Sequence, residues 1–161
     1  MTEINNLFDG NAALKQCPQC GYVLPRPGND DLSAAALYHP WHVRDQAALM
    51  AYVGTLADEA REWLLALFVD DQLNLLSVET MARGGVSECK VDFGEIYLRG
   101  RAVRATGFFL VHNHPSGDPT PSRADIIVTN RLRRLSAELD MPLIEHVIVA
   151  RDGLRGVGSE G

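Results

Sequence analysis

The amino-acid sequence predicts an α+β fold, with helices packed on a sheet made mainly of neighbouring strands. Apolar residues recur at helical spacing in several segments, and pairs of apolar runs are separated by short turns, as in β-hairpins. The resulting order of helix, hairpin, helix, strand, helix and hairpin lacks the regular alternation of a doubly wound parallel sheet. With 161 residues, 46% of them apolar, the chain is long enough for one domain with a full core and a short appendage.

The first part of the chain is expected to be an extension over residues 1–31, ahead of a domain over residues 32–161. Prolines and glycines interrupt every hydrophobic period in this extension. A signal peptide has an apolar stretch behind a basic start, and this extension has none. No apolar run in the chain is long enough to cross a bilayer. We therefore expect a cytoplasmic protein without a membrane partner. The formal net charge of −6 disfavours a general affinity for nucleic-acid phosphates.

The cysteines favour metal or redox chemistry over a disulfide framework. Cys17 and Cys20, in CPQCG, have the spacing of one zinc knuckle, but no second CxxC follows. A second, structural zinc site would need partners such as His39 and His42 or another chain. Cys89 is expected to be an ordinary semi-buried thiol.

Three elements are predicted in the first half of the domain. A helix is expected over residues 43–60, because one helical stripe there carries Leu49, Val53, Leu56 and Ala60. Two apolar runs, over residues 64–69 and 73–78, should be strands of a hairpin joined by Asp70-Asp71-Gln72. The first of these strands is nearly all apolar, so we expect it to be central and buried.

A second helix and a further strand are predicted next. Asp92-Phe93-Gly94-Glu95 has the form of a capping box, and a helix should follow to about residue 104. Its end carries three cations, which suit the helix dipole: Arg99, Arg101 and Arg104. Residues 107–111 form an apolar run that predicts a buried strand leading directly into His112.

The last helix should begin near Ser122, and a hairpin should close the fold. The inward stripe of this helix is expected to comprise Val128, Leu132, Leu135 and Leu139. Residues 144–149 and the Asp152-Gly153 turn predict the closing hairpin.

His112, His114 and Asp125 are the candidate ligands of one catalytic zinc ion. Positions two apart on a strand point to the same face, so both imidazoles should aim at one point. Asp125 lies three residues before Val128 on the inward stripe, where a bare charge would be costly and needs a cation. Two histidines and one aspartate leave a fourth zinc position for water, as catalytic sites do.

Other interpretations of these residues are possible when each is taken alone. A His-x-His pair can be two hydrogen-bonding histidines without metal. Asp125 alone could be an acid that favours the N-terminus of its helix.

The segment HNHPSGDPTPSRAD, from His112 to Asp125, resembles the signature HNHPSGDPxPSxxD of the RadC-like branch of the JAB/MPN superfamily. The spacing His-x-His-Pro, six residues, Ser, two residues, Asp also matches the broader JAMM motif of its metallopeptidases. The resemblance covers most of residues 40–157. It implies a curved, mainly antiparallel sheet flanked by helices, similar to the cytidine-deaminase-like architecture, with zinc bound at the sheet edge.

The resemblance also implies catalytic residues. JAMM proteins use an upstream glutamate as general base and then general acid, and Glu62, just before the predicted strand, matches it. Glu59 is the second candidate, and Glu62 could instead be an exposed acid at a helix end. Ser122 matches the serine that stabilises the oxyanion, and helix capping is an alternative role that could coexist with it. The implied reaction is attack of a metal-activated water on an amide or isopeptide carbonyl of a peptide or protein.

Three functions are carried forward: a zinc peptidase or isopeptidase, a DNA-associated RadC-like protein, and a noncatalytic metal-binding scaffold. His146 matches a histidine common in the family and is expected in the core or against a ligand. Full-length relatives usually carry a helix-hairpin-helix segment, for which we expect no room here, so DNA binding is not favoured. The arginines near residue 100 could contact phosphate or form a solvated helix face. A homodimer is compatible with any of the three.

Overall fold

The computed structural model describes residues 41–42, 53–84 and 91–158. The extension over residues 1–31, both cysteines of CPQCG, Cys89 and the start of the first predicted helix lie outside the described residues. The elements are β1 (Trp41–His42), η2 (Thr55–Asp58), β2 (Trp63–Val69), β3 (Asn74–Arg83), α3 (Phe93–Ala102), β4 (Gly107–Asn113), α4 (Arg123–Ala137), β5 (Leu143–Ala150) and β6 (Gly153–Gly156).

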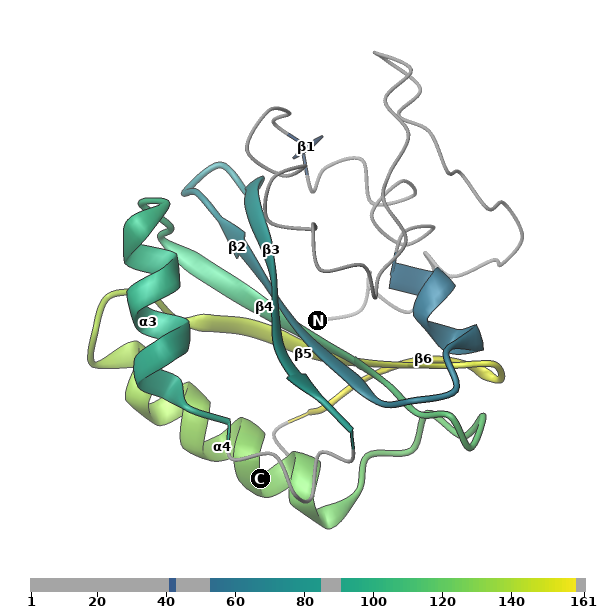
Figure 1. Ribbon diagram of the computed structural model, residues 1–161. Helices are drawn as coiled ribbons and strands as arrows, with labels where there is room; N and C mark the ends of the chain where they lie inside the picture. Colours follow the sequence, from purple (N-terminus) through teal and green to yellow (C-terminus); the bar gives the residue numbers. More distant parts are fainter. Residues whose placement is uncertain (1–40, 43–52, 85–90, 159–161) are drawn as a thin grey trace.

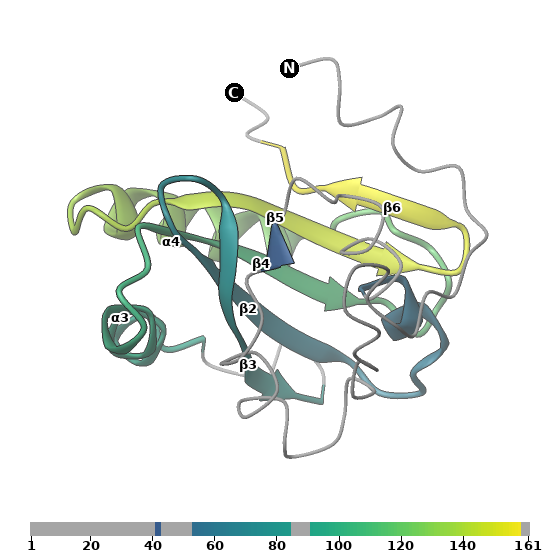
Figure 2. The ribbon, with the colours of Figure 1, turned by 90° about the horizontal axis from the view of Figure 1, so that it is seen from above.

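The strands form one mixed, mainly antiparallel sheet in the order β1-β3-β2-β4-β5-β6. Neighbouring strands are antiparallel except β4 and β5, which run parallel and are joined by the crossover helix α4. Figure 1 shows the twist of this sheet, and Figure 2 shows the strands side by side, with β6 at one edge. The predicted α+β class with a mainly antiparallel sheet is therefore confirmed.

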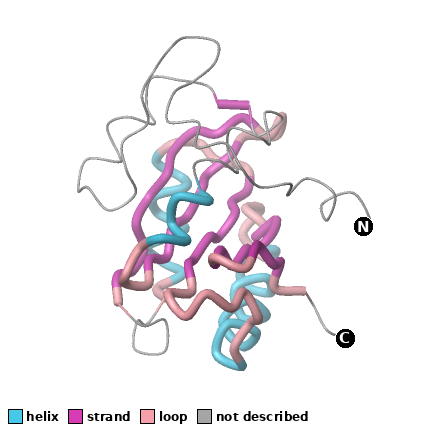
Figure 3. Tube along the Cα trace, turned by 90° about the vertical axis from the view of Figure 1, so that its right-hand side faces the viewer, coloured by secondary structure: helices cyan, strands magenta, loops and turns pink. Residues whose placement is uncertain are grey.

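Both faces of the sheet are covered. Helices α3 and α4 lie on one face and the 3-10 helix η2 on the other (Figure 1), and Figure 3 shows the helical segments against the strands. The alternating residues of β2 divide between two cores, which explains why the whole strand is buried. Leu65 and Leu67 join the cluster beside η2, whereas Leu64 and Phe68 join the cluster beneath α3 and α4.

Both predicted hairpins are present. Strand β3 runs on to Arg83, further than the sequence indicated, and the Asp70 side chain accepts hydrogen bonds from the backbone of Gln72 and Asn74 in the turn. The strand predicted to end at Val111 continues to Asn113, so His112 lies within β4.

The predicted ends of two helices are wrong. The first helix does not reach Ala60, because η2 ends at Asp58 and Glu59 is extended, so that Ala60 is exposed. Helix α3 ends at Ala102, and Arg104 has a left-handed backbone with φ 60° that cannot continue a helix.

The predicted inward stripe of α4 is also partly wrong. Leu139 is 41% exposed, because α4 ends at Ala137 and the helical period no longer applies beyond it. Val128 and Leu135 are only half-buried. The buried residues of the helix are Asp125, Thr129, Leu132 and Ser136.

Across the described part of the chain, every helix is too short or too polar to span a membrane.

Candidate metal centre

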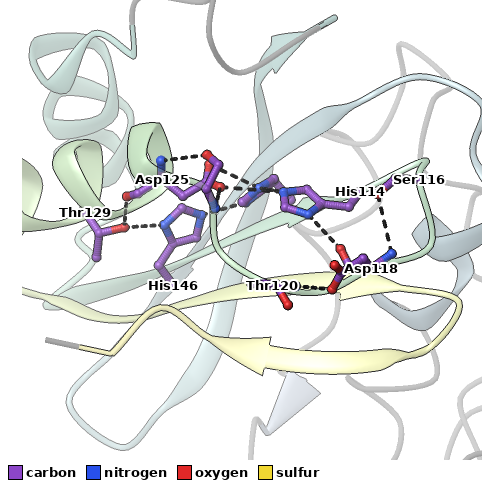
Figure 4. Close-up of polar contacts among 9 residues, drawn as sticks. His114, Ser116, Asp118, Thr120, Asp125, Thr129 and His146 are labelled. Atoms are coloured by element: carbon purple, nitrogen blue, oxygen red, sulfur yellow. Dashed lines mark hydrogen bonds and ion pairs between the residues drawn. The ribbon is translucent and has the colours of Figure 1, made fainter. Parts of the chain in front are cut away.

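The last part of β4, the residue that follows it and the first turn of α4 converge at one point. His112 lies in β4, His114 follows the strand on the same face, and Asp125 lies in the first turn of α4. Nε2 of His112 is 2.9 Å from Nε2 of His114, 3.4 Å from Oδ1 of Asp125, and Nε2 of His114 is 3.6 Å from Oδ2 of Asp125. Figure 4 shows the side chains of His114 and Asp125 pointing toward one another.

Burial decides the charge of the groups at this point. His112 and Asp125 are 0% and 1% exposed. Burial lowers the pKa of His112 to about 4, so its imidazole is neutral at pH 7. Burial alone would raise the pKa of Asp125, but hydrogen bonding with Ser122 and the electrostatic influence of His112 and His114 together hold this pKa below its ordinary value. A buried carboxylate therefore faces a neutral imidazole.

The loop after β4 sets the orientation of His114. Nδ1 of His114 lies 2.9 Å from the backbone oxygen of Asp118. A carbonyl oxygen can only accept, so Nδ1 carries the proton and the Nε2 of a neutral His114 presents its lone pair to the centre. The side chain of Asp118 accepts from the backbone N–H of Thr120 and so shapes the same loop.

Ser122 holds the third ligand in place. Its hydroxyl oxygen accepts from the Asp125 N–H at 3.2 Å, and its own N–H donates to Asp125 Oδ2 at 2.7 Å, which completes a capping box. The helix-capping alternative is thus present in the structure. The contact with the Asp125 N–H uses a lone pair of the Ser122 hydroxyl oxygen.

The arrangement fits a divalent metal ion. Tetrahedral zinc with bonds of about 2.0–2.1 Å would place neighbouring ligand atoms about 3.3 Å apart. The two Nε2 atoms lie 2.9 Å apart, and each lies 3.4 or 3.6 Å from one of the two Asp125 oxygens, so one ligand atom from each residue lies within 4.8 Å of the others. Among the described residues, the buried Oδ1 of Asp125 has no hydrogen-bond partner. Two imidazoles and a carboxylate are a donor set that suits zinc. These three residues could therefore hold a metal ion.

Glu62 lies directly before β2, beside the strand that carries His112. Leu64 pairs with His112 in the antiparallel register of β2 and β4, and Glu62 lies two residues before this pair. Glu59 lies farther along the connection, just after η2. The catalytic role of Glu62 stays a prediction.

Asn113, between the two histidines, points to the opposite face of the sheet. Its side chain forms hydrogen bonds with the backbone on both sides of Glu62. Its amide oxygen accepts from the Trp63 N–H at 2.7 Å, and its amide nitrogen donates to the Arg61 carbonyl at 3.0 Å. The side chain is fully buried. Asn113 therefore links the strand of the ligands to the residues on either side of Glu62. The sequence analysis used Asn113 only as the residue that faces away.

His146 contacts a candidate ligand, as one of its two expected roles requires. Its Nε2 is 2.8 Å from Nδ1 of His112, and its Nδ1 is 2.6 Å from the Thr129 hydroxyl. Burial lowers the pKa of His146 to about 3. Sequence reasoning missed Thr129, whose signal was its place one helical turn after Asp125.

Comparison with known proteins identifies the family of the chain. A family model described as a RadC-like JAB domain matches residues 43–159. A protein of Bordetella avium (strain 197N), described as a UPF0758 protein, is 35% identical over 130 residues, which make up 81% of this chain and 56% of the relative. The chain thus spans little more than half the length of this relative.

Replacing Asn113 should loosen the fold around Glu62. Asn113→Ala leaves the Trp63 N–H and the Arg61 carbonyl without their buried partner, so the free energy of unfolding should fall by about 1–3 kcal/mol. Denaturant unfolding measures this change. Asn130→Ala, at an exposed position of α4, is the matched control and should cause no such loss. Equal stabilities of the two variants would contradict the role of Asn113.

The metal-free protein should lose stability in mild acid. The pKa values of His112 and His146 lie at about 4 and about 3 in the folded protein, below the ordinary 6.5. Between the folded pKa of each histidine and pH 6.5, the unfolded chain therefore binds a proton that the folded protein does not. Stability present above pH 6.5 should therefore be lost as the pH falls, by up to about 1.4 kcal/mol per pH unit for each histidine. Denaturant unfolding in the presence of a chelator, from pH 7 to pH 4.5, measures the slope, and a flat profile would refute it.

Proposed function

Because the chain belongs to the RadC-like JAB domain family, we propose that it is a zinc-dependent hydrolase that cleaves amide or isopeptide bonds in peptides or proteins. The observation that carries the proposal is the buried carboxylate of Asp125, whose Oδ1 has no hydrogen-bond partner among the described residues and faces two imidazoles. A buried charge of this kind needs a cation. A metal site with three protein ligands is typical of catalytic zinc, whereas structural zinc sites are closed by four.

Each residue at the site has a chemical role in this proposal. A zinc ion held by His112, His114 and Asp125 supplies Lewis-acid activation of a water molecule and of the scissile carbonyl. Glu62 takes the proton of the attacking water and passes it to the leaving amine. The Ser122 hydroxyl donates its proton to the carbonyl oxygen as negative charge develops there, since the helix cap uses only the hydroxyl's lone pair.

The DNA-associated alternative has less support from the described residues. Of the three arginines near the end of α3, Arg99 is bound to both Glu79 and Glu95, so its charge is already compensated. Arg101 is exposed and remains available. Retention on DNA that weakens steeply with salt would favour this alternative over the hydrolase.

Metal analysis tests the site itself. The purified protein should contain about one zinc ion bound by the three residues, and the double variant His112→Ala/His114→Ala should lose it, since only one ligand remains. Circular dichroism establishes that the variant is folded. Equal zinc contents in the two proteins would overturn the assignment of the ligands.

A cleavage screen tests the hydrolase. Peptides and conjugates of ubiquitin-like proteins are incubated with the zinc-loaded protein, with Glu62→Gln and with Glu59→Gln, which tests the second candidate for the general base. Loss of the general base should lower the cleavage rate about 10²–10⁴-fold in Glu62→Gln and leave Glu59→Gln nearly unchanged. Cleavage that survives in Glu62→Gln would remove Glu62 from its role. A zinc-bound protein that cleaves none of them would favour the scaffold.

A further inference from the structure

A chain of hydrogen bonds connects the side chain of one candidate ligand, His112, to the backbone of another candidate ligand, Asp125. Nδ1 of His112 lies 2.8 Å from Nε2 of His146. Nδ1 of His146 lies 2.6 Å from the Thr129 hydroxyl, which lies 2.6 Å from the Asp125 carbonyl, and Figure 4 shows these last three residues side by side. All four residues are buried. The chain connects three elements, because His146 lies in β5 beside β4 and Thr129 lies one turn after Asp125 in α4.

The Asp125 carbonyl at the end of this chain determines the direction of the first hydrogen bond. Two oxygen atoms 2.6 Å apart need a hydrogen between them, and the Asp125 carbonyl has none, so Thr129 donates. The Thr129 oxygen then presents only lone pairs to His146. Nδ1 of His146 must therefore carry a proton and donate it to Thr129.

The same reasoning continues to the metal centre. A neutral His146 with its proton on Nδ1 has a lone pair on Nε2, which accepts from Nδ1 of His112. His112 then has its own lone pair on Nε2, the atom that faces His114 and Asp125. With the His114 proton on Nδ1, the two Nε2 lone pairs lie 2.9 Å apart, an arrangement that is favourable only with a cation between them. Every proton in the chain is thus directed away from the centre.

We propose that Thr129 and His146 are positioning residues that keep His112 in the one tautomer able to bind a metal ion, and that tie this ligand to the backbone of Asp125. The inference rests on the metal site of the proposed function and concerns residues that touch no metal themselves. Metal-binding histidines commonly donate their second ring N–H to a fixed acceptor, and loss of that acceptor weakens metal binding. Here the acceptor is a second imidazole, whose own tautomer is set by a threonine.

A pair of variants at Thr129 tests the chain by zinc affinity, with no substrate required. Thr129→Val keeps the shape but removes the hydroxyl, so His146 loses its acceptor and can turn its proton toward His112, which then carries a proton on Nε2. Zinc affinity, measured by competition with a chromophoric chelator, should fall about 10–100-fold. Thr129→Ser keeps the hydroxyl and should stay within about threefold of the unchanged protein. Equal affinities of the Val and Ser variants would overturn the proposal.

Nitrogen NMR of the unchanged protein, freed of metal, tests the tautomers directly. His112 and His146 should both carry their proton on Nδ1, and a proton on Nε2 of His112 would overturn the proposal. This readout also separates the two ideas. If the protein binds no zinc, the metal site of the proposed function fails, while the spectrum still decides whether Thr129 and His146 select the tautomer.

Discussion

A buried carboxylate without a cation beside it is the constraint on which the site depends. Asp125 is 1% exposed, and burial keeps the neighbouring imidazole of His112 neutral. Ionised carboxylates in such surroundings are costly unless a cation compensates them. The capping box with Ser122 holds the carboxylate at the start of α4, where the helix dipole also favours a negative charge. The fold thus maintains a negative site that a metal ion would neutralise.

The alternation of side chains along β4 lets three consecutive residues serve two purposes. His112 and His114 face α4 and form the centre with Asp125, whereas Asn113 faces the core beside η2 and holds the backbone around Glu62. The parallel partner β5 then brings His146 against His112. The two candidate histidine ligands, the candidate base and the hydrogen bonds that hold them therefore depend on β4 and its neighbours β2 and β5.

Much of this arrangement follows from the sequence, and the rest depends on tertiary contacts. Strand parity predicted the convergence of His112 and His114, and the buried helix stripe predicted the inward position of Asp125. The same stripe wrongly predicted that Leu139 is buried, because a hydrophobic period does not reveal where a helix ends. It also did not predict the burial of Thr129, because the period is read from apolar residues alone. The parallel pairing that places His146 depends on how the crossover helix packs. Glu62 came from family resemblance alone, and the structure places it just before β2, two residues from the partner of His112.

X-ray absorption spectroscopy of the zinc-loaded protein tests the central claim most directly, because it reports the atoms around the metal. A zinc ion bound by His112, His114 and Asp125 should show only nitrogen and oxygen neighbours at about 2.0–2.1 Å, with the outer scattering typical of imidazole rings. Sulfur neighbours at about 2.3 Å would instead place the metal on cysteine thiolates such as those of Cys17 and Cys20, and would contradict the account.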